Sequence, residues 1–181
     1  MIRREALTGL ALGVSTSPLN ARFKLNNKPK ELQSDVVIIG GGLGGCASAL
    51  SALDSGLNVT LTEETDWLGG QLTSQGVPPD EHKWIENFGC TKSYRKLRHS
   101  VREFYRKNYP LTNKAKNNIL LNPGNGSVSR LCAEPKAYLK CIENLFLKYL
   151  ANKQLTILKN NIPKSAELLK DEIRCISVEN Q

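Results

Sequence analysis

Residues 35–49 read DVVIIGGGLGGCASA, and the rest of the chain can be interpreted from this stretch. A short apolar run leads into a cluster of glycines, and a segment rich in Ala, Ser and Leu follows. Gly40, Gly42 and Gly45 have the G-x-G-x-x-G spacing of the phosphate-binding turn in a dinucleotide fold. In that turn the glycines permit a tight bend, a close approach to pyrophosphate and close helix–strand packing. The free N–H groups and positive dipole end of the helix then face the phosphates.

The segments on both sides of the glycines complete a strand–helix–strand unit. The pattern predicts a buried strand over 35–39, a helix over 43–55 and a second strand over 57–62. Gly56 is suited to end the helix. Glu63 follows the second strand, 21 residues after Gly42, close to the offset of about 20 residues at which an acidic side chain receives the ribose hydroxyls. A carboxylate only accepts hydrogen bonds, so it favours a ribose diol over a 2′-phosphate.

Two further glycines distinguish a flavin from a nicotinamide cofactor. Gly69 and Gly70 follow Glu63 by six and seven residues. This spacing resembles the E-x5-G-G continuation of FAD-binding, two-dinucleotide-domain flavoproteins, which plain NAD domains usually lack. Gln71, Thr73 and Ser74 would then be polar groups delivered toward the flavin. The alternative for the glycine pair is an ordinary turn.

Three later blocks carry a more specific resemblance. They read GGQLTSQGVPPDEH over 69–82, FGCTKSYRKLR over 88–98 and LNPGNGSVSRLC over 121–132. With the glycine turn, they resemble the bacterial FAD-dependent oxidoreductase family related to the flavin subunit of heterodisulfide reductase. The similarity runs from about Asp35 to the end of the chain.

The resemblance implies an α/β fold with a Rossmann-like parallel sheet of the glutathione-reductase type, with FAD as the cofactor. The family commonly has an aromatic residue at Ser127 and a His at Ala133, so these departures count against a catalytic role for that loop. Some relatives hold iron-sulfur clusters, but no ligand run for one is present in this sequence. The expected cofactor contacts are Gly40, Gly42, Gly44, Gly45, Glu63, Gly69, Gly70, Gln71 and Thr73.

Beyond the nucleotide unit, the pattern predicts loops over 77–89 and 122–126, each rich in turn residues. Helices are expected over 92–107 and from Pro135 to about Leu150. A third parallel strand is expected over 154–158, and a hairpin strand over 173–178. The first helix has an apolar face with arginines mainly opposite it. We expect that basic face to be solvated, with binding of an anionic substrate as the alternative.

Three residues are weak candidates for chemistry. His82 could donate a proton, or be an ordinary surface histidine. Cys90 could be a redox thiol near the flavin, or a buried inert cysteine. Arg130 could hold a carboxylate or the flavin through bidentate bonds, or form a structural ion pair. Hydride chemistry belongs to the flavin, so a missing catalytic set does not argue against an enzyme.

The composition of the chain indicates its general class and excludes several kinds of partner and site. The chain has 181 residues with 40% hydrophobic and 23% charged residues, which is typical of a folded globular domain. The net charge of +8 is accompanied by no nucleic-acid-binding motif, so no nucleic acid is expected as a partner. The five cysteines form no C-x-x-C pair, so no metal site is predicted. No run approaches the roughly 20 apolar residues of a transmembrane helix.

The first thirty residues have the order of an export signal. Arg3 and Arg4 precede a short apolar stretch, and small residues follow up to about Ala21. The arginine pair indicates a twin-arginine signal over 1–30 together with a linker, and hence a periplasmic or exported protein. The alternative is a basic N-terminal tail on a cytoplasmic protein.

The sequence therefore predicts an FAD-dependent oxidoreductase that moves a hydride or electrons between bound FAD and a small-molecule substrate. Residues 31–181 would be the N-terminal part of its FAD/NAD(P)-binding domain, with a helical insertion over about 77–150. The sequence would then be a fragment of a longer enzyme or the product of a truncated gene. An electron-transfer partner is possible for this class. A non-catalytic FAD-binding scaffold and an NAD-binding module remain the alternatives.

Overall fold

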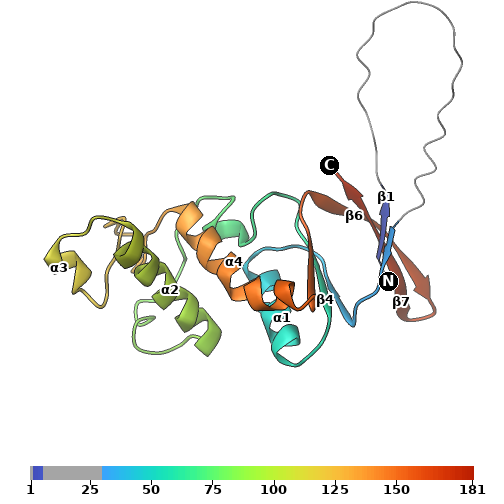
Figure 1. The fold of residues 1–181 in the computed structure, drawn as a ribbon, viewed down its shortest axis with the longest axis horizontal. Coiled ribbons are helices and arrows are strands. Elements are labelled where there is room, and N and C mark those ends of the chain that lie inside the picture. Colours follow the sequence, from blue (N-terminus) through green and yellow to red (C-terminus); the bar gives the residue numbers. More distant parts are fainter. Residues whose placement is uncertain (1, 6–29) are drawn as a thin grey trace, which may run out of the picture.

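The computed structural model of the chain describes residues 2–5 and 30–181 (Figure 1). Its elements, in chain order, are β1 (Ile2–Glu5), β2 (Lys30–Leu32), β3 (Val36–Ile38), α1 (Leu43–Asp54), β4 (Val59–Thr62), the 3-10 turn η1 (Gly70–Leu72), α2 (Lys92–Asn108), α3 (Asn113–Lys116), α4 (Pro135–Ala151), β5 (Leu155–Leu158), β6 (Asn161–Leu169) and β7 (Glu172–Asn180).

A three-stranded parallel sheet carries the glycine turn. Its order is β3-β4-β5, so the strands that the sequence predicts over 35–39, 57–62 and 154–158 are confirmed, each shorter than expected. β4 lies in the middle and all four of its residues are buried. β3 is only half-buried, which corrects the expectation of a fully buried strand. The reason is that, within the described residues, β4 is its only strand neighbour in this sheet.

Helix α1 begins and ends where the sequence predicts. Gly56 has a φ of +86°, a left-handed conformation that suits glycine. The N–H groups of Gly56 and Leu57 donate to the carbonyls of Leu53 and Ala52, at 3.0 and 3.1 Å. This is a Schellman C-cap, which satisfies carbonyls that the helix end would otherwise leave unpaired.

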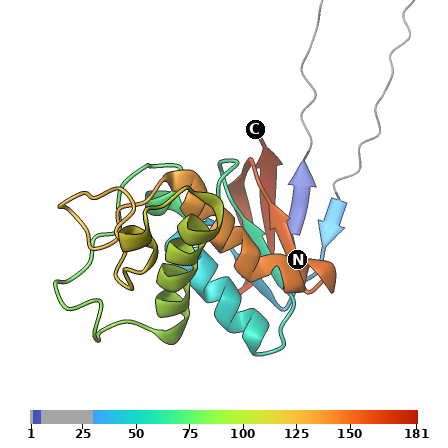
Figure 2. The same cartoon turned by 60° about the vertical axis from the view of Figure 1, so that its left-hand side comes forward.

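The helices lie together on one side of the parallel sheet (Figure 2). α1 packs on β3 and β4, α4 packs on α1 and β5, and α2 packs on α4. The helix predicted from Pro135 is confirmed as α4, and its Tyr138, Ile142 and Tyr149 are buried in the main core. Pro135 occupies the first turn of that helix, where its missing N–H needs no partner. These contacts place the helical segments directly against the nucleotide unit.

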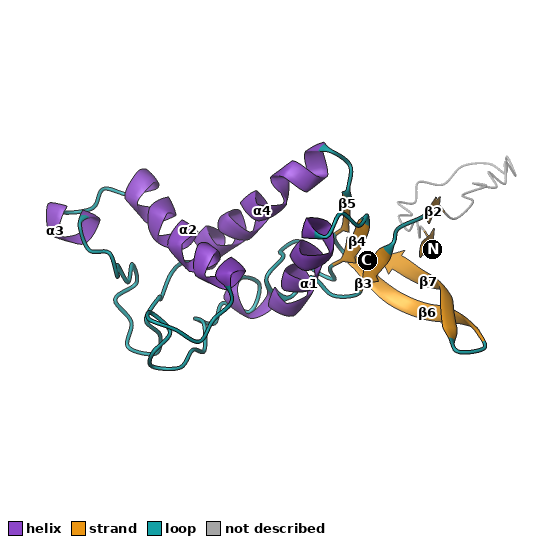
Figure 3. Ribbon diagram, turned by 90° about the horizontal axis from the view of Figure 1, so that it is seen from below, coloured by secondary structure: helices purple, strands orange, loops and turns teal. Residues whose placement is uncertain are grey.

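A second sheet lies at the far end of the molecule from α2 and α3 (Figure 3). Its order is β2-β1-β7-β6, and β6 and β7 form the antiparallel hairpin that the sequence predicts over 173–178. Val37 of the parallel sheet, together with Leu158, packs against Val178 of this second sheet in a small separate core. The parallel sheet is therefore covered by helices on one face and partly by the second sheet on the other.

The predicted export signal falls mostly outside the described residues, since residues 1 and 6–29 are not described. Residues 2–5 form β1, whose backbone pairs with β7 in parallel and with β2 in antiparallel orientation. Export is not tested by this pairing and stays a prediction. Across the described ranges, no helix combines the length and apolar character needed to cross a bilayer.

Candidate functional site

The glycine turn, residues 40–45, forms an open cradle between β3 and α1. Gly40 has a φ of +97° and donates its N–H to the Thr62 hydroxyl at 3.2 Å. Gly42 is the N-cap residue of α1, and no side chain caps this helix end. A Cβ placed on Gly40 or Gly42 would meet no atom within 4 Å. The first N–H groups of α1 thus lack side-chain partners beside free space, as an anionic ligand requires.

Gly45 allows α1 to pack closely against the backbone of the same turn. A Cβ on Gly45 would lie 1.9 Å from the carbonyl oxygen of Gly40. Side-chain atoms do not approach a backbone oxygen that closely, so α1 can lie this near β3 only with glycine at the position. This is the helix–strand packing role that the spacing predicts for the third glycine.

Glu63 lies under the glycine turn at the end of β4 and is 6% exposed. Its Oε2 accepts the Gly41 N–H at 3.0 Å. Its Oε1 accepts the N–H and the hydroxyl of Thr65, at 2.8 and 2.7 Å. Each carboxylate oxygen can accept about two hydrogen bonds, so Oε2 keeps capacity for one more donor. The structure fixes the carboxylate beneath the turn, and its bond to a ribose remains a prediction.

Gly69 and Gly70 lie directly against the glycine turn. The Gly69 N–H donates to the Gly41 carbonyl at 2.8 Å, and a Cβ on Gly70 would lie 3.2 Å from the Gly42 Cα. Both residues have left-handed backbone, with φ values of +108° and +53°. A Cβ on Gly69 would also lie 2.6 Å from the Ile142 side chain. The pair is therefore more than an ordinary turn, and replacing it with alanines would disturb the fold as well as any ligand.

Among the polar residues after this pair, Thr73 is placed differently from the expectation. The Thr73 hydroxyl is buried and donates to the Leu68 carbonyl at 2.7 Å. It stabilises the loop rather than facing a ligand space, which corrects the orientation predicted for its side chain. Gln71 donates its side-chain N–H to the Pro78 carbonyl at 3.3 Å and is exposed. Ser74 is exposed, with its hydroxyl 3.4 Å from the Gly70 carbonyl.

Cys46, in the first turn of α1, is buried against the glycine turn. Its Sγ donates to the Gly41 carbonyl at 3.2 Å. Burial, helped by the nearby negative charge of Glu63, raises the pKa of this thiol to about 12. The thiol therefore stays protonated at neutral pH and serves as a weak donor that holds the turn. Cys46 was not among the residues predicted for the site, although its position one residue after Gly45 places it in the glycine turn.

Two of the three weak catalytic candidates, His82 and Cys90, belong to one segment, where the His82 ring packs against Gly89, the residue before Cys90. His82 is exposed, and its ring accepts the Trp84 N–H at 3.2 Å within its own loop. Cys90 is half-buried just before α2. Arg130 is exposed and lines a cleft with Glu81.

The arginine face of α2 is not solvated as the sequence predicts. Arg98 and Arg102 have side chains only 1% and 2% exposed. Arg98 pairs with Glu81 and Glu86, and Arg102 holds Glu86 with bonds of 2.6 and 3.2 Å. We call these four residues the ion-pair cluster. The prediction was wrong for these two arginines because the loop over 77–89 folds back over the helix and supplies carboxylates there.

Arginines of α2 also donate hydrogen bonds to backbone carbonyl oxygens of the neighbouring loops. Arg95 donates to the carbonyls of Ile85 and Glu86, at 2.6 and 2.8 Å. Arg102 also donates its Nε–H to the Leu121 carbonyl at 2.9 Å. Burial would raise the pKa of the Glu86 carboxyl, but the hydrogen bonds and charges of Arg102 and Arg98 lower it below its ordinary value. The helix therefore organises the loops on either side of it.

Residues 35–181 match the model of a family described as FAD dependent oxidoreductase. Solved structures are also similar to this chain, at low identity. An oxidised steroid monooxygenase bound to NADP is 14% identical, with a TM-score of 0.37, over 81% of this chain and 24% of that chain. The Mycobacterium smegmatis Sdh1 complex in the apo form is 11% identical, with a TM-score of 0.47, over 81% of this chain and 32% of that chain.

A third structure, OTEMO in complex with FAD and NADP, is 16% identical with a TM-score of 0.40, over 82% of this chain and 24% of that chain. The chain thus spans about a quarter to a third of the length of these three structures.

Proposed function

Because the chain belongs to the FAD dependent oxidoreductase family, we propose that it binds FAD at the glycine turn and takes part in hydride or electron transfer with a small-molecule substrate. The observation that carries the proposal is the open cradle at Gly42. There the uncapped start of α1 faces space that no side chain fills. A diphosphate matches this site in charge and in its need for N–H donors.

Different residues around the cradle would bind different parts of FAD. The N–H groups of Gly42, Gly44 and Gly45 would bind the diphosphate, and the spare acceptor capacity of Glu63 would receive a ribose hydroxyl. Gly69 and Gly70 would let the chain pass close beside the diphosphate. When bound, FAD supplies the redox chemistry, while the protein supplies position and electrostatics.

The finer family relation and the location in the cell are also proposals. The block GGQLTSQGVPPDEH supports kinship with the flavin subunit of heterodisulfide reductase, and the Arg3–Arg4 pair supports export by a twin-arginine signal. Cleavage between about Ser17 and Ala21 would remove β1 from the second sheet. Sequencing the N-terminus of protein from the native host tests this, because intact Met1 on cytoplasmic protein would contradict export.

Purification of the full chain with its flavin tests the proposed function. We expect the visible absorbance of oxidised flavin at a stoichiometry near one per chain, bleached by dithionite and restored by air. Glu63→Gln should weaken FAD binding by about 1.5–3 kcal/mol, the contribution of a hydrogen bond to a charged group. A chain that binds NAD but takes up no FAD would contradict the proposal, and so would FAD affinity unchanged in Glu63→Gln.

A further inference from the structure

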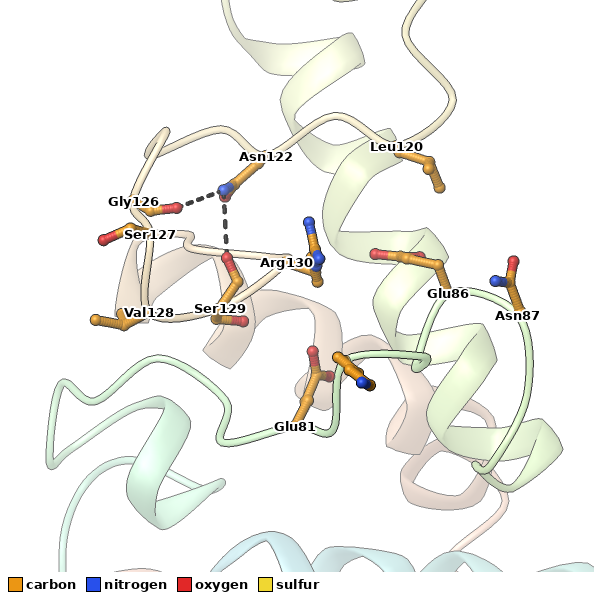
Figure 4. Close-up of a pocket in the computed structure, with 11 residues that line it drawn as sticks. Glu81, Glu86, Asn87, Leu120, Asn122, Gly126, Ser127, Val128, Ser129 and Arg130 are labelled. Atoms are coloured by element: carbon orange, nitrogen blue, oxygen red, sulfur yellow. Dashed lines mark hydrogen bonds between the residues drawn. The ribbon is translucent and has the colours of Figure 1, made fainter.

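A polar cleft lies apart from the glycine turn, between the loop over 81–87 and the loop over 120–130 (Figure 4). Its volume is about 760 Å³, enough for a small organic molecule. One wall carries Glu81 and the opposite wall carries Arg130, and Figure 4 shows the Glu81 carboxylate pointing toward the loop that holds Arg130. The function proposed above uses neither side chain.

Glu81 presents a buried acceptor that no described residue satisfies. Its side chain is 4% exposed. Its Oε1 accepts the Tyr94 hydroxyl at 2.6 Å and also binds Arg98. Its Oε2 is buried and has no hydrogen-bond partner among the described residues. An unsatisfied buried acceptor of this kind destabilises the folded chain, and a donor on a bound ligand would remove that cost.

The charges around Glu81 decide which kind of donor suits this oxygen. The ion-pair cluster contains two carboxylates, Glu81 and Glu86, and two guanidiniums, Arg98 and Arg102. Its charges therefore already balance. A cationic ligand group would add an unpaired positive charge beside two buried arginines, which is unfavourable. A neutral hydroxyl can donate to the oxygen without disturbing that balance.

On the other wall of the cleft, Arg130 favours a negatively charged ligand group. Its guanidinium is exposed and has no ion pair or hydrogen bond with any residue in the described part of the chain. Lys83 adds a second positive charge to the lining, with its Nζ 4.4 Å from the Trp84 ring centroid. A guanidinium binds a carboxylate through two parallel hydrogen bonds. This wall therefore favours an anionic end of a ligand.

The remaining lining fits a short polar chain. Ser127 and Asn87 contribute neutral hydrogen-bonding groups, while Leu120 and Val128 contribute apolar surface. We propose that the cleft is a binding site for a small polyhydroxy carboxylic acid, with its carboxylate on Arg130 and a hydroxyl on Glu81 Oε2. The proposal concerns binding and does not depend on FAD.

Calorimetric titration of the full chain with D-gluconate tests the proposal. Sorbitol has the hydroxyls without the carboxylate, and hexanoate has the carboxylate without the hydroxyls. We expect gluconate to bind at least about tenfold more tightly than either compound, because each of them loses one of the two polar anchors. Gluconate binding that is absent, or no tighter than hexanoate binding, would overturn the proposal.

Two arginine variants locate the binding within the chain. Arg130→Gln should weaken gluconate binding by about tenfold or more and leave sorbitol binding unchanged. Arg174→Gln is the matched control, since Arg174 is exposed on β7, outside the cleft, and should bind gluconate as the wild type does. Equal affinity of the two variants would overturn the assignment. The flavin content of each preparation is measured separately, so failure to bind FAD cannot be mistaken for failure of the cleft.

Discussion

The glycine turn exposes backbone polar groups, whereas the ion-pair cluster buries charged side chains. At the glycine turn the residues lack side chains. The backbone of Gly42 therefore faces open space, and Gly45 can lie against β3. In the ion-pair cluster the chain brings charged side chains together until Arg98 and Glu81 are almost fully covered. A backbone site depends on a local spacing of residues. A side-chain cluster depends on which distant loop folds over the helix.

The largest effect is expected where the turn is most tightly packed. Gly45→Ala would place a Cβ 1.9 Å from the Gly40 carbonyl oxygen. We expect the variant to lose at least about 4 kcal/mol of folding free energy, seen as insoluble protein or a greatly lowered urea midpoint. Gly44→Ala is the matched control, because a Cβ there meets no atom within 4 Å. Similar stability for the two variants would show that the close helix–strand contact does not exist.

The second-largest loss of stability is expected in the ion-pair cluster. Arg98→Met leaves Glu81 buried without its charged partner, which should cost about 3 kcal/mol or more in the free energy of unfolding. Arg174→Met removes an exposed arginine and should change stability by no more than about 0.5 kcal/mol. Urea titration of the wild type and the two variants measures the change in unfolding free energy for each substitution. A small loss for Arg98→Met would mean that the helix face is solvated after all.

Acid should weaken the ion-pair cluster. The folded-state pKa of Glu86 lies below its ordinary value of 4.5, so ionised Glu86 contributes stability above that pH. The contribution is lost as pH falls through the lowered folded-state pKa, when the carboxyl is protonated. Below pH 4.5, unfolding free energy in Glu86→Gln should depend less steeply on pH, by up to about 1.4 kcal/mol per pH unit. Parallel acid profiles for the variant and the wild type would refute the role of Glu86.

The smallest effect concerns thiol reactivity in the two regions. Cys46 is buried at the glycine turn with a pKa raised to about 12, whereas Cys90, near the cluster, is half-buried. Labelling of the native chain with iodoacetamide at pH 8 should modify Cys90 first and leave Cys46 unmodified until the protein unfolds. Mass spectrometry of the digested protein identifies the modified residue. Early labelling of Cys46 would contradict its burial against Gly41.

The sequence predicted most of the nucleotide unit because its signals are local. The spacing of Gly40, Gly42 and Gly45 and the apolar strand before them determine the turn, and Gly56 determines where α1 ends. The family spacing predicted Gly69 and Gly70 as cofactor contacts, and the bond from Gly69 to the turn is seen only in the structure.

The arginine pairs could not be predicted in the same way. The periodicity of α2 shows only which residues lie opposite its apolar stripe, and solvent is the default environment for such a face. Burial of Arg98 and Arg102 depends on a loop without regular structure that places Glu81 and Glu86 over the helix. An isolated helical pattern holds no information about that loop. The orientation of Thr73 was missed for a similar reason, since its partner is a backbone carbonyl of the same loop.

FAD titration of Gly42→Ala tests the central claim most directly. Gly42 has an extended backbone that alanine can adopt, and its Cβ would enter empty space, so the apo fold should keep its stability. The same methyl group would occupy the position proposed for the FAD diphosphate. We predict FAD affinity at least about tenfold lower than wild type, with Ser48→Ala, an exposed position of α1, as the unaffected control. Wild-type FAD affinity in a stable Gly42→Ala protein would contradict binding at the glycine turn.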